Sequence, residues 1–200
     1  MSDPPKPRRG RPRTLDADKV LDAAVDAYRR SDPADVSVNA VCALAGVSKP
    51  ALYREFVSED GLMRAALDRY AEQVLSDIFR ILDESAPLAP TLEALVRFAS
   101  EDPRMETGCL FYKMRAGKHR LGPRTLEAVE AVDAGAVEAF AAYLDARRAA
   151  GDRGGGLSSR QAARYLVEQI GLALTQRAAG EPTAQVRDTL RLALSVFSRP

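Results

Sequence analysis

The stretch that most constrains the fold runs from Ser37 to Leu62 and predicts two short helices joined by a tight turn. Ser37 is a suitable N-cap for an apolar helix, and Gly46 permits the left-handed backbone that a turn after this helix requires. Ser48 caps the second helix, and Pro50 falls in its first turn, where a missing N–H costs little. This arrangement is a helix-turn-helix, in which the second helix lies in the major groove of DNA.

The second helix has an apolar side and a polar side. Leu52 and Phe56 are four residues apart, so they share the face that we expect to be buried. The remaining side chains are free to meet DNA. They are Lys49 at the rim of that face, and Pro50, Tyr53 and Arg54 on the opposite side.

The motif A-G-V-S-K-P-x-L-Y-x-x-F, followed by a polar cap and x-x-x-L, resembles the signature of the TetR family of bacterial transcription regulators. The resemblance implies that Tyr53 touches a phosphate and that Lys49 and Pro50 begin a groove-entering recognition helix. Where many relatives have His and Lys, this chain has Glu55 and Glu59. A carboxylate cannot donate a hydrogen bond to a phosphate, so these two positions depart from the family pattern.

The resemblance also implies an all-α fold. An N-terminal three-helix helix-turn-helix DNA-binding domain would be joined by a long helix to a C-terminal helical ligand-binding and dimerisation domain. We expect a flexible basic arm over residues 1–14, the DNA-binding domain over 15–62, and the second domain over 63–200. Helical patterns are expected over 16–30, 59–84, 91–100, 108–116, 123–150 and 158–179, and from Thr183, a possible cap, to the end.

Charge is unevenly distributed along a chain whose formal net charge is only +1. Residues 1–14 contain five basic residues and one acidic residue, whereas residues 15–60 contain five basic residues and nine acidic ones. Because non-specific DNA affinity comes from neutralising phosphates, the arm must supply most of that affinity if DNA is the ligand. The alternative is a solubilising tail. The predicted DNA-binding residues are Arg8, Arg9, Arg11, Arg13, Ser37, Ser48, Lys49, Pro50, Tyr53 and Arg54.

The last two helices have small and aliphatic faces and are expected to form a symmetric dimer, as the resemblance implies. The predicted interface residues are Leu166, Ile170, Leu174, Val186, Leu190, Leu194 and Phe197. A ligand pocket is expected between helices of the second domain. Its candidate residues are Phe98, Met105, Phe111, Met114, His119, Phe140, Tyr143, Tyr165 and Gln169, although ordinary core packing also explains most of them.

No catalytic group of residues is visible, so we predict no enzyme activity, no cofactor and no metal. His119 is the only histidine, and the two cysteines, Cys42 and Cys109, lie far apart. No run of eighteen apolar residues exists, which predicts a cytoplasmic protein with no membrane partner. The sequence predicts a homodimeric transcriptional regulator, a repressor released from its double-stranded DNA operator by a small apolar effector. The alternative is a dimeric ligand- or partner-binding protein with a vestigial DNA-binding domain.

Overall fold

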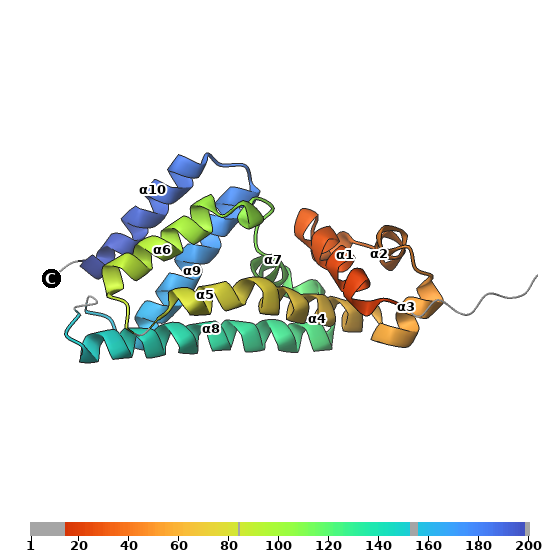
Figure 1. Ribbon diagram of the computed structural model, residues 1–200, viewed down its shortest axis with the longest axis horizontal. Helices are drawn as coiled ribbons and strands as arrows, with labels where there is room; N and C mark the ends of the chain where they lie inside the picture. Colours follow the sequence, from red (N-terminus) through yellow and green to blue (C-terminus); the bar gives the residue numbers. More distant parts are fainter. Residues whose placement is uncertain (1–14, 84, 153–155, 199–200) are drawn as a thin grey trace, which may run out of the picture.

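The computed structural model describes residues 15–83, 85–152 and 156–198, and every regular element in these ranges is helical. The predicted all-α fold is therefore confirmed (Figure 1). The predicted arm, with Arg8, Arg9, Arg11 and Arg13, lies outside the described residues. Across the described ranges, no helix combines the length and the apolar character that crossing a membrane would need.

Three short helices form one end of the molecule: α1 (Ala17–Arg30), α2 (Val38–Ala45) and α3 (Lys49–Phe56) (Figure 1). The predicted caps are present. The Ser37 hydroxyl accepts a hydrogen bond from the Ala40 amide at 3.2 Å, and the Ser48 hydroxyl accepts one from the Ala51 amide at 3.4 Å. Gly46 adopts φ 69° and ψ 35°, the left-handed conformation that the turn between α2 and α3 requires.

A long helical rod leads away from these three helices. It consists of α4 (Glu59–Tyr70), a π-helical turn (Ala71–Leu75) and α5 (Ser76–Ile81). The sequence predicted one helix as far as Glu84, so the rod ends earlier than expected and contains a wider turn that sequence periodicity does not indicate. Figure 1 shows the rod lying alongside α8 (Pro123–Ala149) over much of its length.

The rest of the chain folds into α6 (Leu88–Glu101), α7 (Leu110–Ala116), α8, α9 (Ser159–Ala178) and α10 (Thr183–Leu194). Short 3-10 turns lie at Pro33–Asp35, Pro103–Met105, Lys118–Arg120 and Ser195–Ser198. Helix α6 begins before the expected Thr91, because Pro90 falls in its first turn, where no backbone N–H is needed. Thr183 does not cap α10, and its hydroxyl instead accepts a hydrogen bond from the Arg177 guanidinium at 3.0 Å.

The residues predicted at the dimer interface lie inside the core of the single chain. Each is at most 3% exposed: Leu166, Ile170, Leu174, Val186, Leu190, Leu194 and Phe197. This choice of residues is corrected, because an apolar stripe at helical spacing marks the side that faces the chain's own core. The large apolar side chains that α9 and α10 expose are Leu172 at 50% and Leu192 at 74%.

Candidate DNA-binding surface and ligand pocket

Helix α3 packs on the core through Leu52 and the partly buried Phe56, and it exposes a short basic surface. Leu52 is completely buried, whereas Lys49, Pro50 and Arg54 are exposed and Tyr53 is half-buried. Ser37 and Ser48 are also exposed at the starts of α2 and α3, where their hydroxyls cap the helices. The structure therefore leaves all the predicted DNA-binding residues of the described ranges accessible to solvent, Tyr53 in part.

Tyr53 is held by neighbours of both charges. Its hydroxyl donates a hydrogen bond to Glu59 Oε1 at 3.3 Å, and the Lys49 ammonium lies 5.6 Å from the centre of its ring. Glu55 is exposed on the same helix. The hydroxyl that would reach a phosphate is thus bound to an acid, and two carboxylates lie close to the basic surface.

The turn between α3 and α4 is tight and strained. Val57 adopts φ 68° and ψ −43°, and the Ser58 amide donates a hydrogen bond to the Phe56 carbonyl at 2.7 Å, which together define a γ-turn. A positive φ is unfavourable for a β-branched residue, and Val57 is 68% exposed, so no burial of its side chain offsets the strain. The start of α4 therefore lies directly against the end of the recognition helix.

Many acidic residues of the segment 15–60 face the rest of the chain instead of the predicted DNA surface. Asp18 and Asp22 on α1 form ion pairs with Arg69 on α4, at 3.3 and 3.1 Å. Asp32 pairs with Arg120 at 3.2 Å, and Asp35 pairs with the same guanidinium. These four acidic residues therefore form ion pairs with arginines outside the segment 15–60.

Asp60 extends this pattern to the long helix α8. Its carboxylate accepts hydrogen bonds from the backbone amides of Arg124 and Thr125 at 2.9 and 3.0 Å, and from the Thr125 hydroxyl at 2.6 Å. Partial burial opposes ionisation, but these hydrogen bonds outweigh it and lower the pKa of Asp60. The carboxylate is therefore ionised in the folded protein near neutral pH.

An apolar pocket of about 350 Å³ lies between the rod and helices α7, α8 and α9. The rod contributes Ala71, Leu75, Ile78, Phe79 and Leu82, and the other helices contribute Phe111, Tyr112, Ala131, Val132, Gly135, Ala136, Phe140, Val167 and Ile170. None of these described lining residues is charged. The Tyr112 hydroxyl, their one polar side-chain group, donates to the Val167 carbonyl at 2.7 Å. Burial raises the pKa of the Tyr112 phenol, so it stays neutral.

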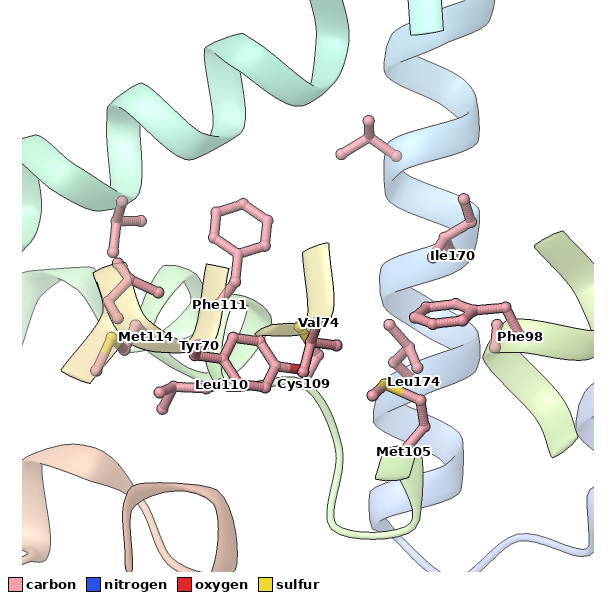
Figure 2. Close-up of a cluster of buried hydrophobic side chains, with 14 of the residues drawn as sticks. Tyr70, Val74, Phe98, Met105, Cys109, Leu110, Phe111, Met114, Ile170 and Leu174 are labelled. Carbon is pink, nitrogen blue, oxygen red and sulfur yellow. The ribbon is translucent and has the colours of Figure 1, made fainter. Parts of the chain in front are cut away.

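Of the residues predicted to bind a ligand, Phe111 and Phe140 line this pocket. Figure 2 shows Phe98 and Met105 beside Leu174 on α9, where they are core residues, and Met114 is completely buried. Tyr143 and Tyr165 donate their hydroxyls to the carbonyls of Ala86 and Ala193, at 3.0 and 2.9 Å. His119 is exposed and lines a separate depression beside Arg120, and Gln169 does not line the pocket. The structure therefore does not bring these seven residues to the pocket.

The pocket residues that sequence reasoning missed are mostly small or come from the rod. Ala131 and Gly135 are four residues apart on one face of α8, and Ala71 lies in the π-helical turn. A stripe of small residues leaves space between helices, and this stripe was the available sequence signal. Of the aromatic residues favoured from sequence, Phe98 and Tyr143 instead fill the core.

The two cysteines are both free and buried. Burial raises the pKa of the Cys109 thiol, which keeps it protonated and unreactive. In the described part of the chain, no group of three or more His, Cys, Asp or Glu side chains is arranged to hold a metal ion.

The N-terminal helices match a known protein family. Residues 20–66 match the sequence model of the bacterial regulatory proteins of the tetR family. The match places residues 20–66, about a quarter of the chain, with the TetR family. This is a family of regulatory proteins, in agreement with the prediction that the chain is not an enzyme.

Two curated relatives each match part of this chain. It is 37% identical over 68 residues to the HTH-type transcriptional repressor ComR of Escherichia coli strain K12, covering 34% of this chain and 32% of ComR. It is 27% identical over 95 residues to the uncharacterized HTH-type transcriptional regulator Rv1255c of Mycobacterium tuberculosis, covering 46% of this chain and 47% of the relative. The matches thus span about a third of ComR and about half of Rv1255c.

Solved structures match the fold over nearly the whole chain. The reduced form of E. coli NemR has a TM-score of 0.80 at 16% identity and covers 92% of this chain and 98% of its own. The TetR-family regulator CifR, in complex with 26-base-pair operator DNA, has a TM-score of 0.77 at 21% identity and covers 94% and 100%. At these identities, the likeness demonstrates a shared fold.

Proposed function

We propose that this protein is a homodimeric DNA-binding transcriptional regulator, a repressor that a small neutral apolar molecule releases from its operator. The observation that carries the proposal is a continuous rod, from α4 through the π-helical turn to α5, that connects two surfaces. One end adjoins the recognition helix, and the other end lines the apolar pocket. A rigid element of this kind transmits a tilt from one site to the other.

DNA is supported as a partner by the basic surface of α3 and by what the relatives do. ComR is a transcriptional repressor, and CifR has been solved bound to operator DNA. Lys49 and Arg54 are exposed cations on the helix that the family matches, and cations of this kind contact phosphates or base edges. The basic arm supplies further positive charge ahead of the helix.

The test for DNA binding is selection of duplexes from a random pool, followed by fluorescence anisotropy on the enriched sequence. Arg54→Ala should weaken binding about 5- to 150-fold, because a specific base contact is worth about 1–3 kcal/mol. Arg80→Ala is the matched control, since Arg80 is exposed on α5 and far along the chain from α3. Enrichment of no sequence, with equal weak binding by both variants, would refute the proposal.

The pocket supports a ligand without charge and with few hydrogen-bonding groups. A buried ion or polar group without a partner is costly. The one polar side-chain group among the described lining residues, the Tyr112 hydroxyl, already donates its proton to the Val167 carbonyl. The walls are aliphatic and aromatic, and the volume of about 350 Å³ suits a small molecule. The apolar walls therefore favour an apolar ligand.

A neutral apolar fluorophore, 1-N-phenylnaphthylamine, provides a direct test of the pocket. We expect saturable fluorescence enhancement in the parent protein and its loss in Ala136→Phe, whose new ring would occupy the pocket. Ala142→Phe is the control, because it adds the same ring at an exposed position of the same helix. Equal binding by parent and Ala136→Phe would place the fluorophore elsewhere and remove the pocket from the proposal.

A dimer is proposed through the outward faces of α9 and α10, not through their buried stripes. Leu172 and Leu192 are the large apolar side chains that these helices expose to solvent. We expect the double change Leu172→Glu with Leu192→Glu to produce a monomer in sedimentation equilibrium, while Leu44→Glu, at an exposed leucine of α2, leaves a dimer. A dimer in all three proteins would exclude these faces.

The second candidate function is a dimeric ligand- or partner-binding protein with a vestigial DNA-binding domain. It is favoured by the exposed carboxylates of Glu55 and Glu59, which repel phosphates at positions where many family members have donors. Fluorophore binding without selection of any DNA sequence would support this alternative. A cytoplasmic location stays a prediction under either function.

A further inference from the structure

The first turn of α4 contacts two separate helices, α3 and α8, through three consecutive residues. Glu59 accepts a hydrogen bond from the Tyr53 hydroxyl of the recognition helix. Asp60 binds the start of α8. Gly61 packs against the last carbonyl of α3, because a Cβ at this position would lie 2.1 Å from the Phe56 oxygen. This turn therefore joins the recognition helix to the long helix of the pocket.

The contact between Asp60 and α8 substitutes for a missing cap. The N-cap residue of α8 is Gly122, which has no side chain, and no residue of the local segment caps the helix through its side chain. The first amides of a helix lack partners within the helix and favour a nearby negative charge. Asp60 supplies that charge from a position 64 residues earlier in the chain.

The sequence around Gly122 makes room for this carboxylate. A Cβ on Gly122 would lie 2.4 Å from Cγ of Asp60, so any larger residue would displace the acid. Thr125 is fully buried, and its hydroxyl is within hydrogen-bonding distance of both the Asp60 carboxylate and the Asp60 carbonyl. The Asp60 carboxylate is thus closely packed against both Gly122 and Thr125.

Helix α8 also forms one wall of the apolar pocket, through Ala131, Val132, Gly135 and Ala136. A displacement of α8 along or across its axis would move the amides that Asp60 binds. The same turn of α4 contacts Tyr53 and Phe56 of α3. One connection from the pocket wall to the recognition helix therefore runs through the Asp60 side chain, at the junction with the start of α8.

We propose that Asp60 is a positioning residue that fixes the orientation of recognition helix α3 relative to α8. This is a second connection, in addition to the covalent rod, between the pocket and the predicted DNA surface. Its consequence for DNA rests on the proposed function, whereas the connection itself is a property of the free protein and is tested without DNA or ligand.

The test is amide hydrogen exchange of the full chain with the contact weakened from the α8 side. Thr125→Val removes the hydroxyl with little change in shape, and Gly122→Ala displaces the carboxylate. We expect exchange of the α3 amides over residues 52–56 to accelerate about fivefold in both, which is the ratio that one ordinary hydrogen bond supports. Thr125→Ser keeps the hydroxyl and should restore the parent rates.

Asp68→Asn is the matched control, because Asp68 is an exposed acid of α4 that pairs only with Arg64 of the same helix among the described contacts. It should leave α3 unchanged. Exchange that accelerates only at the start of α8, or equally in α3 and in the α9 core around Val167, would overturn the proposal, since the contact would then be a local cap or a general stabiliser. If Gly122→Ala fails to fold, the exchange rates of the α3 amides in Thr125→Val and Thr125→Ser still test the proposal.

Binding to a selected duplex separates this inference from the proposed function. If the parent binds DNA, Thr125→Val should weaken binding and Thr125→Ser should not. If the parent binds no DNA, the proposed function fails, while the exchange result still supports or overturns the role of Asp60.

Discussion

Two glycines in the middle of long helices provide a pair of matched substitutions with opposite expected effects. Gly135 lies within α8 and Gly171 within α9, so replacement of either by alanine carries the same helix-propensity gain of about 1 kcal/mol. A Cβ at Gly135 would meet no atom within 4 Å. A Cβ at Gly171 would lie 2.4 Å from Cε1 and 2.7 Å from Cδ1 of Tyr112, closer than real contacts allow.

The Tyr112 ring cannot move aside freely. Its hydroxyl donates to the Val167 carbonyl at 2.7 Å, and its ring packs edge-on against Phe111 with centroids 4.9 Å apart. Overpacking a tight site costs about 1–3 kcal/mol, and loss of the hydrogen bond costs about 1 kcal/mol more. After subtraction of the propensity gain, Gly171→Ala should destabilise the protein by about 1–3 kcal/mol.

The assay is urea unfolding followed by circular dichroism, at one protein concentration so that any self-association contributes equally. Gly135→Ala should increase the free energy of unfolding by about 1 kcal/mol, equivalent to a rise in Tm of about 2–4 °C for a chain of this size. Gly171→Ala should decrease it. Equal stabilisation by both substitutions would refute the reasoning, because Tyr112 would then not be held against α9.

Three further predictions concern single features of the chain. Val57→Gly should stabilise the protein by about 1 kcal/mol in the same assay, because glycine relieves the positive φ of the γ-turn. Deletion of residues 1–13 should flatten the dependence of log affinity on log salt in duplex binding measured by anisotropy, by about 0.9 for each phosphate that the arm neutralises; an unchanged slope would exclude the arm. The lowered pKa of Asp60 means that its stabilisation is present above the ordinary carboxyl pKa and is lost as the pH falls through the folded value. Asp60→Asn should therefore lower Tm near pH 7 and flatten the decline of Tm below about pH 4; a parallel decline in both proteins would contradict this assignment.

Local sequence signals were sufficient for the DNA-binding end of the fold. Capping residues and a left-handed glycine act within four or five residues of themselves, so Ser37, Gly46 and Ser48 define α2 and α3 without tertiary information. The same holds for Ser158, whose capping box with Gln161 starts α9. Likewise, the exposed side of α3 followed from the helical period alone.

The pocket and the outward faces depend on packing that a local pattern does not determine. Ile170 illustrates this: its apolar spacing suggested a dimer contact, yet it is 1% exposed and lines the pocket. Periodicity identifies the buried side of a helix but not what lies opposite it. The cavity exists where small residues such as Ala131 and Gly135 face the rod, and that juxtaposition follows only from the three-dimensional arrangement.

The acidic composition of the DNA-binding segment has a physical explanation in the fold. Asp18, Asp22, Asp32, Asp35 and Asp60 bind arginines or helix amides of residues beyond position 60, so their negative charge is partly neutralised within the chain. Self-neutralised acids repel a DNA backbone less than free ones do, because the field of an ion pair falls off faster than that of a single charge. The same contacts hold α1 on the rod, the Pro33–Asp35 turn on Arg120, and the rod on α8. Weakening them would therefore be expected to alter both the orientation of α3 and its electrostatic attraction for DNA.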